Sequence, residues 1–396
     1  MLISVDNLGL PLSIQNGYRE TIAQRIGTEK EAVYIACTHT HLAPSTAATE
    51  VGITEPEYCR FLGQKLSDAA WLAIQDAAPT KMLFSHGRVE DVAFIRRFLM
   101  KDGSVKTNPG RQNPEIDHPL GEPDEQTSLL ILKREGKPEI GIVHFQVHPD
   151  VIGGRKVSAD FPGFARKLYE KLIPNSLCMY LNGAQGDTNH IDVRHGPDEL
   201  TNGYGRSRYM GEKIAMSVAA NYPLAKVIED DTIRYGQIDV PVLRNQGTPE
   251  QTEKARVIYE DYMADGIASA EQYRACKQRH SMNSMTIPQT VRIMRLAGLP
   301  ERTQLPVTVL RVGGAVFAGF PGEAFTKMGQ ILKTESPFDV TFPTCCTNGY
   351  EGYFPTQDAF DMGAYETRTT RFCGGTAEKL TESALELIRK LSGNGD

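Results

Sequence analysis

Apolar runs that are typical of buried strands alternate with amphipathic helical patterns in the first half of this chain, and the alternation limits the folds open to it. Strand-like runs occur at residues 32–41, 141–149 and 177–183, and helical patterns occur at residues 57–77 and 162–173. Strands that alternate with helices are typical of layered folds in which helices cover a sheet. The sequence therefore predicts an α/β (α+β mixed) fold, with a layered mixed β-sheet and flanking helices.

The second half of the chain departs from this pattern once. Residues 248–300 are charged and helical in pattern, so we expect a helical insertion there, a hairpin of helices laid against the main body. A strand pattern returns at residues 305–323, with a hairpin turn at residues 313–314, and a helical pattern closes the chain at residues 376–391. Because no segment rich in proline, serine and glycine separates the parts, we predict a single domain over residues 1–396.

The composition argues against several classes of partner and location. The chain has 43 Lys and Arg against 49 Asp and Glu, a formal net charge of −6, which argues against nucleic acid or an anionic membrane as a partner. No apolar run approaches the roughly 20 residues that a membrane helix needs, and the N-terminus has no pattern of a secretory signal. The seven cysteines are scattered, with no CxxC pair, so we expect reduced thiols, no membrane insertion and a cytoplasmic location.

Two of the apolar runs end in histidines that alternate with other residues. His39 and His41 would project from the same face of a strand, because side chains alternate between its two faces. By the same alternation His144, Gln146 and His148 would share one face of a second strand. A single histidine at the end of a strand is more often a satisfied polar residue than a metal ligand. Each group therefore has an ordinary alternative when it is taken alone.

Two further apolar runs end in polar groups. One leads into the polar segment at residues 182–190, and the other ends at Glu323 after a Pro-Gly turn. These residues would also suit helix caps and the first turn of a helix, where the dipole favours a carboxylate. Four strand ends of this kind predict one site at a common sheet edge. Two neutral imidazoles and a carboxylate are the ligands of hydrolytic zinc sites that keep a position open for water.

Five segments resemble motifs of the neutral/alkaline (non-lysosomal) ceramidase family, and they occur in the order found in that family. They are CTHTHLAP (residues 37–44), FQVHPDVIGGRKVSADFPGFA (145–165), NGAQGDTNH (182–190), FAGFPGEAFTKMG (317–329) and NGYEGYFPTQDAFDMGAYE (348–366). The resemblance implies a metallohydrolase whose fold is like the N-terminal catalytic domain of these ceramidases.

The resemblance also implies a set of metal ligands, with zinc as the expected ion and another divalent metal as the alternative. The positions that match the family's ligands are His39, His148, Glu323 and Tyr353. A phenolate ligand such as Tyr353 is unusual, but a divalent cation lowers the pKa of the group that binds it. A core aromatic side chain is the alternative for this tyrosine.

Four other positions match residues that line the family's active site, and the resemblance implies a catalytic role for them: His41, Arg96, Asn189 and Tyr365. His41 would face the substrate rather than the metal. Arg96 lies where the family has an Asn-Arg pair, with Ile95 in place of the asparagine. Asn189 stands where the family has its functional serine, so it cannot be a nucleophile, although its amide can hydrogen-bond a substrate.

The chain also departs from the family's pattern at both ends. It begins inside that pattern, and it stops before the C-terminal β-sandwich domain of full ceramidases. These departures favour a small polar molecule over a sphingolipid in a bilayer as the substrate. They also leave a homo-oligomer open, since a partner subunit would complete a shortened N-terminus.

The leading hypothesis is therefore a zinc-dependent hydrolase that cleaves an amide (N-acyl) or related bond of a small polar substrate by a metal-activated water. His41, Arg96 and Tyr365 would face the developing oxyanion, where preorganised donors act most strongly. One alternative is a metal-dependent lyase or isomerase that acts on a sugar or sugar acid, which the asparagine at the serine position favours. A second is a non-catalytic binding protein on the same scaffold, and the retention of every candidate ligand counts against it.

Overall fold

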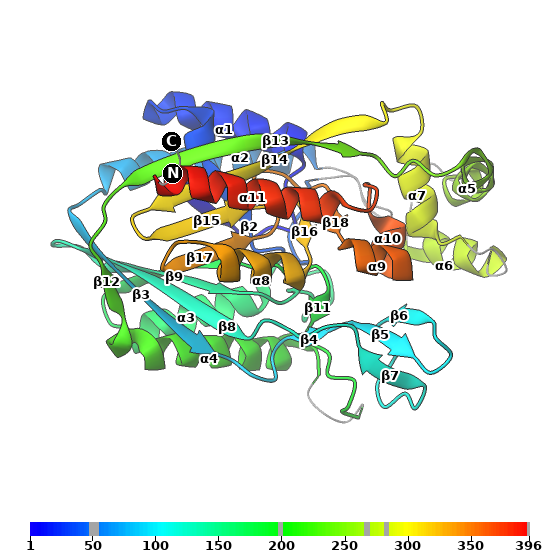
Figure 1. Cartoon of the computed structure of the whole chain (residues 1–396), viewed down its shortest axis with the longest axis horizontal. Coiled ribbons are helices and arrows are strands. Elements are labelled where there is room, and N and C mark those ends of the chain that lie inside the picture. The colour runs from blue at the N-terminus through cyan, green and yellow to red at the C-terminus, as the bar shows by residue number, and fades with distance from the viewer. Residues whose placement is uncertain (47–54, 197–200, 265–269, 281–284, 394–396) are drawn as a thin grey trace.

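The computed structural model describes residues 1–46, 55–196, 201–264, 270–280 and 285–393. These residues form two main β-sheets that lie face to face and are covered by helices (Figure 1). The larger sheet has the strand order β10 (Ser176–Asn182), β9 (Glu139–Phe145), β8 (Gln126–Arg134), β3 (Thr80–Arg88), β12 (Lys226–Ile228). The other sheet has the order β13 (Ile233–Leu243), β14 (Arg302–Val312), β15 (Ala315–Gly319), β17 (Val340–Thr344).

Helices pack on the outer face of each sheet, so that the molecule has four layers (Figure 1). The larger sheet packs against α3 (Asp160–Leu172) and α4 (Gly203–Asn221), and the 3-10 turn η2 (Tyr222–Leu224) follows α4. The other sheet packs against α1 (Leu12–Ile26), α2 (Pro56–Gln75), α8 (Thr326–Glu335) and α11 (Thr376–Ser392), and the 3-10 turn η1 (Lys30–Ala32) lies between α1 and α2 in the chain.

The two sheets share an apolar layer that arises from the alternation of side chains along each strand. In β8, Leu129 and Ile131 face the helices, whereas Leu130 faces the other sheet. In β15, Val316 faces the helices and Phe317 lies between the sheets. Strands that are buried on both faces are apolar at nearly every position, which is why these runs stand out in the sequence. The predicted α/β fold, with a layered mixed β-sheet and flanking helices, is confirmed.

Three parallel strand pairs bring the carboxyl ends of several strands to one edge. β2 (Tyr34–Cys37) is parallel to β1 (Leu2–Val5), β10 is parallel to β9, and β17 is parallel to β15. Beyond these ends lie two short pairs and two short helices (Figure 1): β4 (Phe94–Ile95) with β11 (Thr188–Asn189), β16 (Glu323–Ala324) with β18 (Tyr353–Phe354), α9 (Gln357–Met362) and α10 (Tyr365–Thr369). This edge is where layered α/β proteins commonly bind ligands.

Two small units flank that edge in Figure 1. One is a three-stranded sheet of β6 (Val105–Thr107), β5 (Arg97–Met100) and β7 (Ile116–Pro119). The other is a helical segment, in which the described residues form α5 (Pro249–Tyr262), α6 (Ala270–Arg279) and α7 (Ile287–Leu296). These three helices fall within the predicted insertion at 248–300, of which residues 265–269 and 281–284 lie outside the described residues. The single-domain assignment stays a prediction.

Two general expectations from the sequence bear on the described residues. All seven cysteines are free thiols. Among the helices that the structure describes, none combines the length and apolar character that crossing a membrane requires.

The expected strand geometry at the histidine pairs is wrong in both places. β2 ends at Cys37, and His39 has a φ of 70°, so the chain has left the strand before either histidine. β9 ends at Phe145, before His148. His144 lies within β9, and its Nε2 donates to the carbonyl of Pro343, 2.8 Å away, between the sheets. The histidines that meet in space are therefore brought together by irregular backbone after each strand, where alternation no longer applies.

Candidate metal centre

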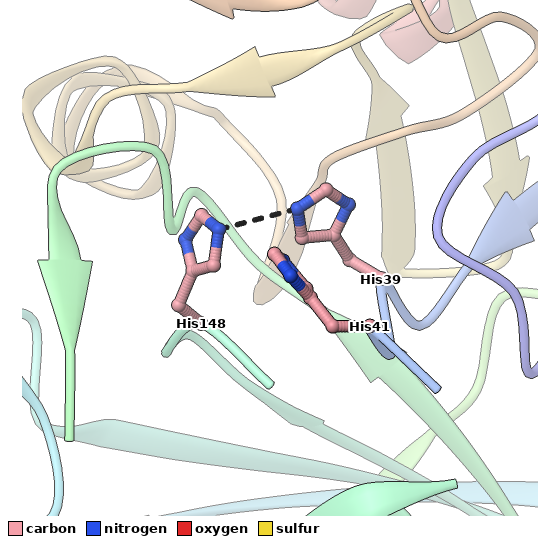
Figure 2. A group of neighbouring side chains, drawn as sticks. All are labelled: His39, His41 and His148. Carbon is pink, nitrogen blue, oxygen red and sulfur yellow. Dashed lines mark hydrogen bonds between the residues drawn. The ribbon is translucent and has the colours of Figure 1, made fainter. Parts of the chain in front are cut away.

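The Nε2 atoms of His39 and His148 face each other. The Nδ1 atom of His39 donates to the carbonyl of Leu8 at 2.6 Å, and that of His148 donates to the carbonyl of Gln185 at 3.2 Å. A carbonyl oxygen can only accept a hydrogen bond, so each Nδ1 carries the proton of its ring. Each Nε2 therefore keeps its lone pair. The two Nε2 atoms are 3.2 Å apart (Figure 2). Both residues are buried.

The Glu323 carboxylate completes a triangle with these nitrogens. Its Oε2 atom lies 3.4 Å from the Nε2 of His39 and 3.5 Å from the Nε2 of His148. This oxygen is buried and accepts no hydrogen bond from the residues that the structure describes. Zinc bonds of about 2.0–2.1 Å in a tetrahedral site place ligand atoms about 3.4 Å apart. The spacing of the three donor atoms and the buried oxygen without a partner therefore fit a divalent metal.

The charges of these groups are those that metal ligands need. Burial by itself would raise the pKa of Glu323, but the facing His39 and His148 and the Arg96 guanidinium lower it to about 2. Burial and the neighbouring Arg96 hold the pKa of His148 well below its usual value. An ionised carboxylate and a neutral imidazole can bind a cation without first losing a proton.

Of the two tyrosines predicted at the site, Tyr353 lies beside Glu323 and Tyr365 packs against Tyr353. Tyr353 pairs with Glu323 across β16 and β18, and the Arg96 guanidinium lies 5.3 Å from the centre of its ring. Burial and the Glu323 carboxylate raise the pKa of the Tyr353 phenol, and Arg96 opposes that rise. The ring of Tyr365 stands edge-on to that of Tyr353, with centroids 5.9 Å apart, and is 46% exposed. The roles of Tyr353 as a ligand and of Tyr365 in catalysis stay predictions.

Two hydrogen bonds hold the guanidinium group of Arg96 in place. Its Nε donates to Glu366 Oε1 at 2.8 Å, one Nη donates to the carbonyl of Gly186 at 2.8 Å, and the other lies 3.5 Å from the Nδ1 of His148. Glu366 is fully buried and also accepts from Arg97 and Thr107. The predicted catalytic arginine is thus held against the metal triangle by a buried carboxylate.

His41 is the exposed member of the histidine group. Its ring centre is 5.2 Å from that of His39 and 5.4 Å from that of His148, and the three rings face one another in Figure 2. Ring nitrogens of all three lie within 4.8 Å of one another. Because His39 and His148 are buried and His41 is exposed, His41 marks the side from which a substrate would approach.

The Asn189 side chain is occupied by hydrogen bonds, one of them to a distant segment of the chain. Its side-chain amide donates to the Asn108 side chain at 2.6 Å, and its carbonyl accepts from the backbone N–H of Ile191 at 2.9 Å. These contacts brace the segment that follows β10. A substrate-binding role for Asn189 stays a prediction.

Sequence reasoning missed several residues that the structure places around the centre. Tyr350 donates to the other oxygen of Glu323 at 3.0 Å. Glu366 holds Arg96, and Asp150 pairs with His190 at 3.1 Å. Tyr350 and Glu366 each lie within three residues of a predicted tyrosine, which was the available signal. The Leu8 carbonyl, which sets the tautomer of His39, is a backbone group and carries no signal in the sequence.

A second group of ligand-type side chains lies in the helical segment, where Asp261, Cys276 and His280 approach within 4.8 Å. The Asp261 carboxylate already accepts from Arg279 at 2.9 Å and from His280 at 3.0 Å. The Arg279 guanidinium therefore supplies the positive charge that a metal ion would supply at such a group. These contacts join α5 to α6, and we assign the group a structural role.

Comparison with known proteins gives the same fold. No family model matches the sequence, and no curated protein matches it. Among solved structures, the chain is similar to the neutral ceramidase from Pseudomonas aeruginosa, with a TM-score of 0.74 and 14% identity, over 99% of this chain and 66% of that chain. It is also similar to a ceramidase complexed with C2, with a TM-score of 0.72 and 14% identity, over 99% of this chain and 67% of that chain. The predicted ceramidase-like fold is confirmed, and the chain spans about two thirds of the length of these proteins.

Proposed function

We propose that this protein is a zinc-dependent hydrolase that cleaves an amide (N-acyl) or related bond of a small polar substrate. One observation carries the proposal: three buried donor atoms, two imidazole nitrogens and a carboxylate oxygen without a hydrogen bond, face one another at 3.2–3.5 Å. The likeness to two ceramidases supports an amide as the bond that is cleaved.

His39, His148 and Glu323 would hold the ion, and Tyr353 is the proposed fourth ligand. Bound zinc supplies a Lewis acid that polarises a carbonyl and lowers the pKa of a water molecule. The hydrogen bonds from the two imidazole Nδ1 atoms to backbone carbonyls orient the rings, which is the usual outer support of a metal ligand. Another divalent metal is the alternative, since ligand type favours zinc without excluding others.

The other polar groups of the site would act on the substrate carbonyl. Arg96 carries a fixed positive charge in a buried environment, where a preorganised charge stabilises a developing oxyanion most strongly. His41 and Tyr365, on the exposed side, would donate hydrogen bonds to the substrate oxygen and position the bond to be cleaved. The free thiols of the seven cysteines support the proposed cytoplasmic location, where thiols stay reduced.

Metal analysis joined to product analysis tests this proposal. We expect about one zinc ion per chain in protein purified without chelator, and loss of the metal and of hydrolysis in His148→Ala. His118→Ala, at an exposed histidine of β7, is the matched control and should keep both. A screen over N-acylated amino acids and amino sugars in ¹⁸O-labelled water should place the label in the released acid.

Two outcomes would contradict the proposal. An active His148→Ala variant that contains no metal would exclude the metal centre. Turnover of a sugar acid that leaves a new double bond and no label would replace hydrolysis by the lyase reaction.

A further inference from the structure

The two oxygens of the Glu323 carboxylate have different surroundings. Oε1 accepts a hydrogen bond from the Tyr350 hydroxyl at 3.0 Å. Oε2 has no hydrogen-bond partner within the described part of the chain and faces the Nε2 atoms of His39 and His148. A carboxylate that turned about its last bond would exchange these two oxygens, so a partner at Oε1 fixes which oxygen faces the imidazoles.

The Tyr350 ring is itself held in place by close packing. It lies 5.7 Å from the ring of His39. On its other side is Gly9, where an added Cβ would stand 2.2 Å from the Cγ atom of Tyr350. The space that a Cβ would fill at position 9 is thus taken up by the tyrosine ring, which packs directly on the glycine backbone. The segment just before Gly9 also provides the Leu8 carbonyl that accepts from His39, so one stretch of backbone positions both side chains.

The backbone just after Tyr350 is tied to the backbone around Glu323. The N–H of Glu351 donates to the carbonyl of Pro321 at 2.8 Å, and the N–H of Glu323 donates to the carbonyl of Gly352 at 2.8 Å. The tyrosine and the glutamate are therefore fixed relative to each other by main-chain hydrogen bonds as well as by the contact between their side chains.

We propose that Tyr350 is a positioning residue of the metal centre, which holds Glu323 so that Oε2 faces the two imidazoles. The inference rests on the proposed metal binding and adds a residue to it. Tyr350 acts through Glu323 and takes no part in the bond-breaking step. Partners of this kind, which orient a ligand from behind, contribute about 10- to 100-fold to metal affinity in other metal sites.

Metal titration of Tyr350→Phe tests the inference, because this change removes only the hydroxyl group. We expect its zinc dissociation constant, measured by competition with a chromophoric chelator, to rise about 10- to 100-fold. The absorption spectrum of the cobalt-substituted protein should change as well, since the carboxylate is free to reorient. Tyr180→Phe is the control: the Tyr180 hydroxyl is buried and donates to the carbonyl of Phe145, but it does not contact Glu323. It should leave the affinity unchanged.

A second variant covers the case in which Tyr350→Phe fails to fold. Gly9→Ala keeps the hydroxyl but displaces the ring, and it should also weaken zinc binding. Gly17→Ala is its control, since a Cβ there meets nothing within 4 Å. The inference is overturned, with the proposed function intact, if wild-type protein binds zinc and the altered protein binds it equally tightly. Wild-type protein that binds no divalent metal would overturn both.

Discussion

At the scale of single residues, the candidate centre depends on what lies behind each ligand. The imidazoles of His39 and His148 can bind a metal through Nε2 because their Nδ1 atoms are hydrogen-bonded to backbone carbonyls. Arg96 is held by Glu366 in the same manner. The residue types therefore indicate which groups could bind a metal, whereas the hydrogen-bond partners decide which atom of each group would face the metal.

Gly186 is one residue at which this arrangement can be tested. Its N–H donates to the carbonyl of Ala324 at 2.8 Å, and an added Cβ would stand 2.6 Å from the carbonyl oxygen of Glu323. In Gly186→Ala, β16 would have to move, so we expect weaker zinc binding and a loss of about 1–3 kcal/mol in the free energy of unfolding. Zinc titration and urea unfolding measure the two effects. Gly17→Ala, at an exposed position of α1, should lower neither the zinc affinity nor the free energy of unfolding. A Gly186→Ala protein with wild-type zinc affinity would contradict the prediction.

His144 predicts a pH dependence of stability that has no connection with the metal. Burial, aided by Lys333, lowers the pKa of His144 to about 3, against roughly 6.5 in an unfolded chain. Between those values the unfolded chain binds a proton that the folded chain does not bind. The contribution of His144 to the free energy of unfolding should therefore be fully present above pH 6.5 and fall by about 1.4 kcal/mol per pH unit as the pH decreases toward 3.

Urea unfolding at several pH values between 7 and 4.5 checks this effect of His144. The free energy of unfolding of His144→Asn should fall less steeply with decreasing pH than that of the wild type. His118→Asn, at a half-exposed histidine, should keep the wild-type slope. Equal slopes for His144→Asn and wild type would show that the folded state accommodates the proton.

At the scale of secondary-structure elements, the sequence predicted what depends on local pattern. The runs that became β2, β9, β10 and β15 were visible because their strands are apolar on both faces. The ends of those strands were harder to predict. The φ of 70° at His39 is uncommon for a residue other than glycine, so the alternation that drew attention to His39 and His41 does not describe the backbone there.

The helical segment should behave as a local unit. The Asp261 carboxylate on α5 accepts from Arg279 and His280 at the end of α6. Asp261→Asn removes the charge that holds these two groups, so we expect faster hydrogen exchange in α5 and α6 and little change in the two main sheets. Glu250→Gln is the control, because Glu250 pairs with Lys254 on the exposed face of the same helix. Exchange rates in α5 and α6 that match those of the wild type would contradict the structural role of Asp261.

At the scale of the whole molecule, the sequence could not specify how the strands assemble. The order β10-β9-β8-β3-β12 places β3 between β8 and a strand about 140 residues later in the chain. Pairing between strands that lie so far apart in the chain produces no periodic pattern in the sequence of either strand. The resemblance to ceramidase motifs predicted the overall fold instead. The role of the Tyr350 hydroxyl was missed because three tyrosines, Tyr350, Tyr353 and Tyr365, lie within one short stretch.

The same assembly predicts that metal binding stabilises the whole molecule. His39 follows β2, His148 follows β9 of the larger sheet, and Glu323 begins β16, just after β15 of the other sheet. An ion held by these three residues would link both sheets, so unfolding of either sheet would release it. At a free zinc concentration of 100 times the dissociation constant, the free energy of unfolding should rise by about 2.7 kcal/mol. Urea unfolding with and without zinc measures this rise. His118→Ala should show the full rise and His148→Ala almost none; an equal rise in both would mean that zinc binds elsewhere.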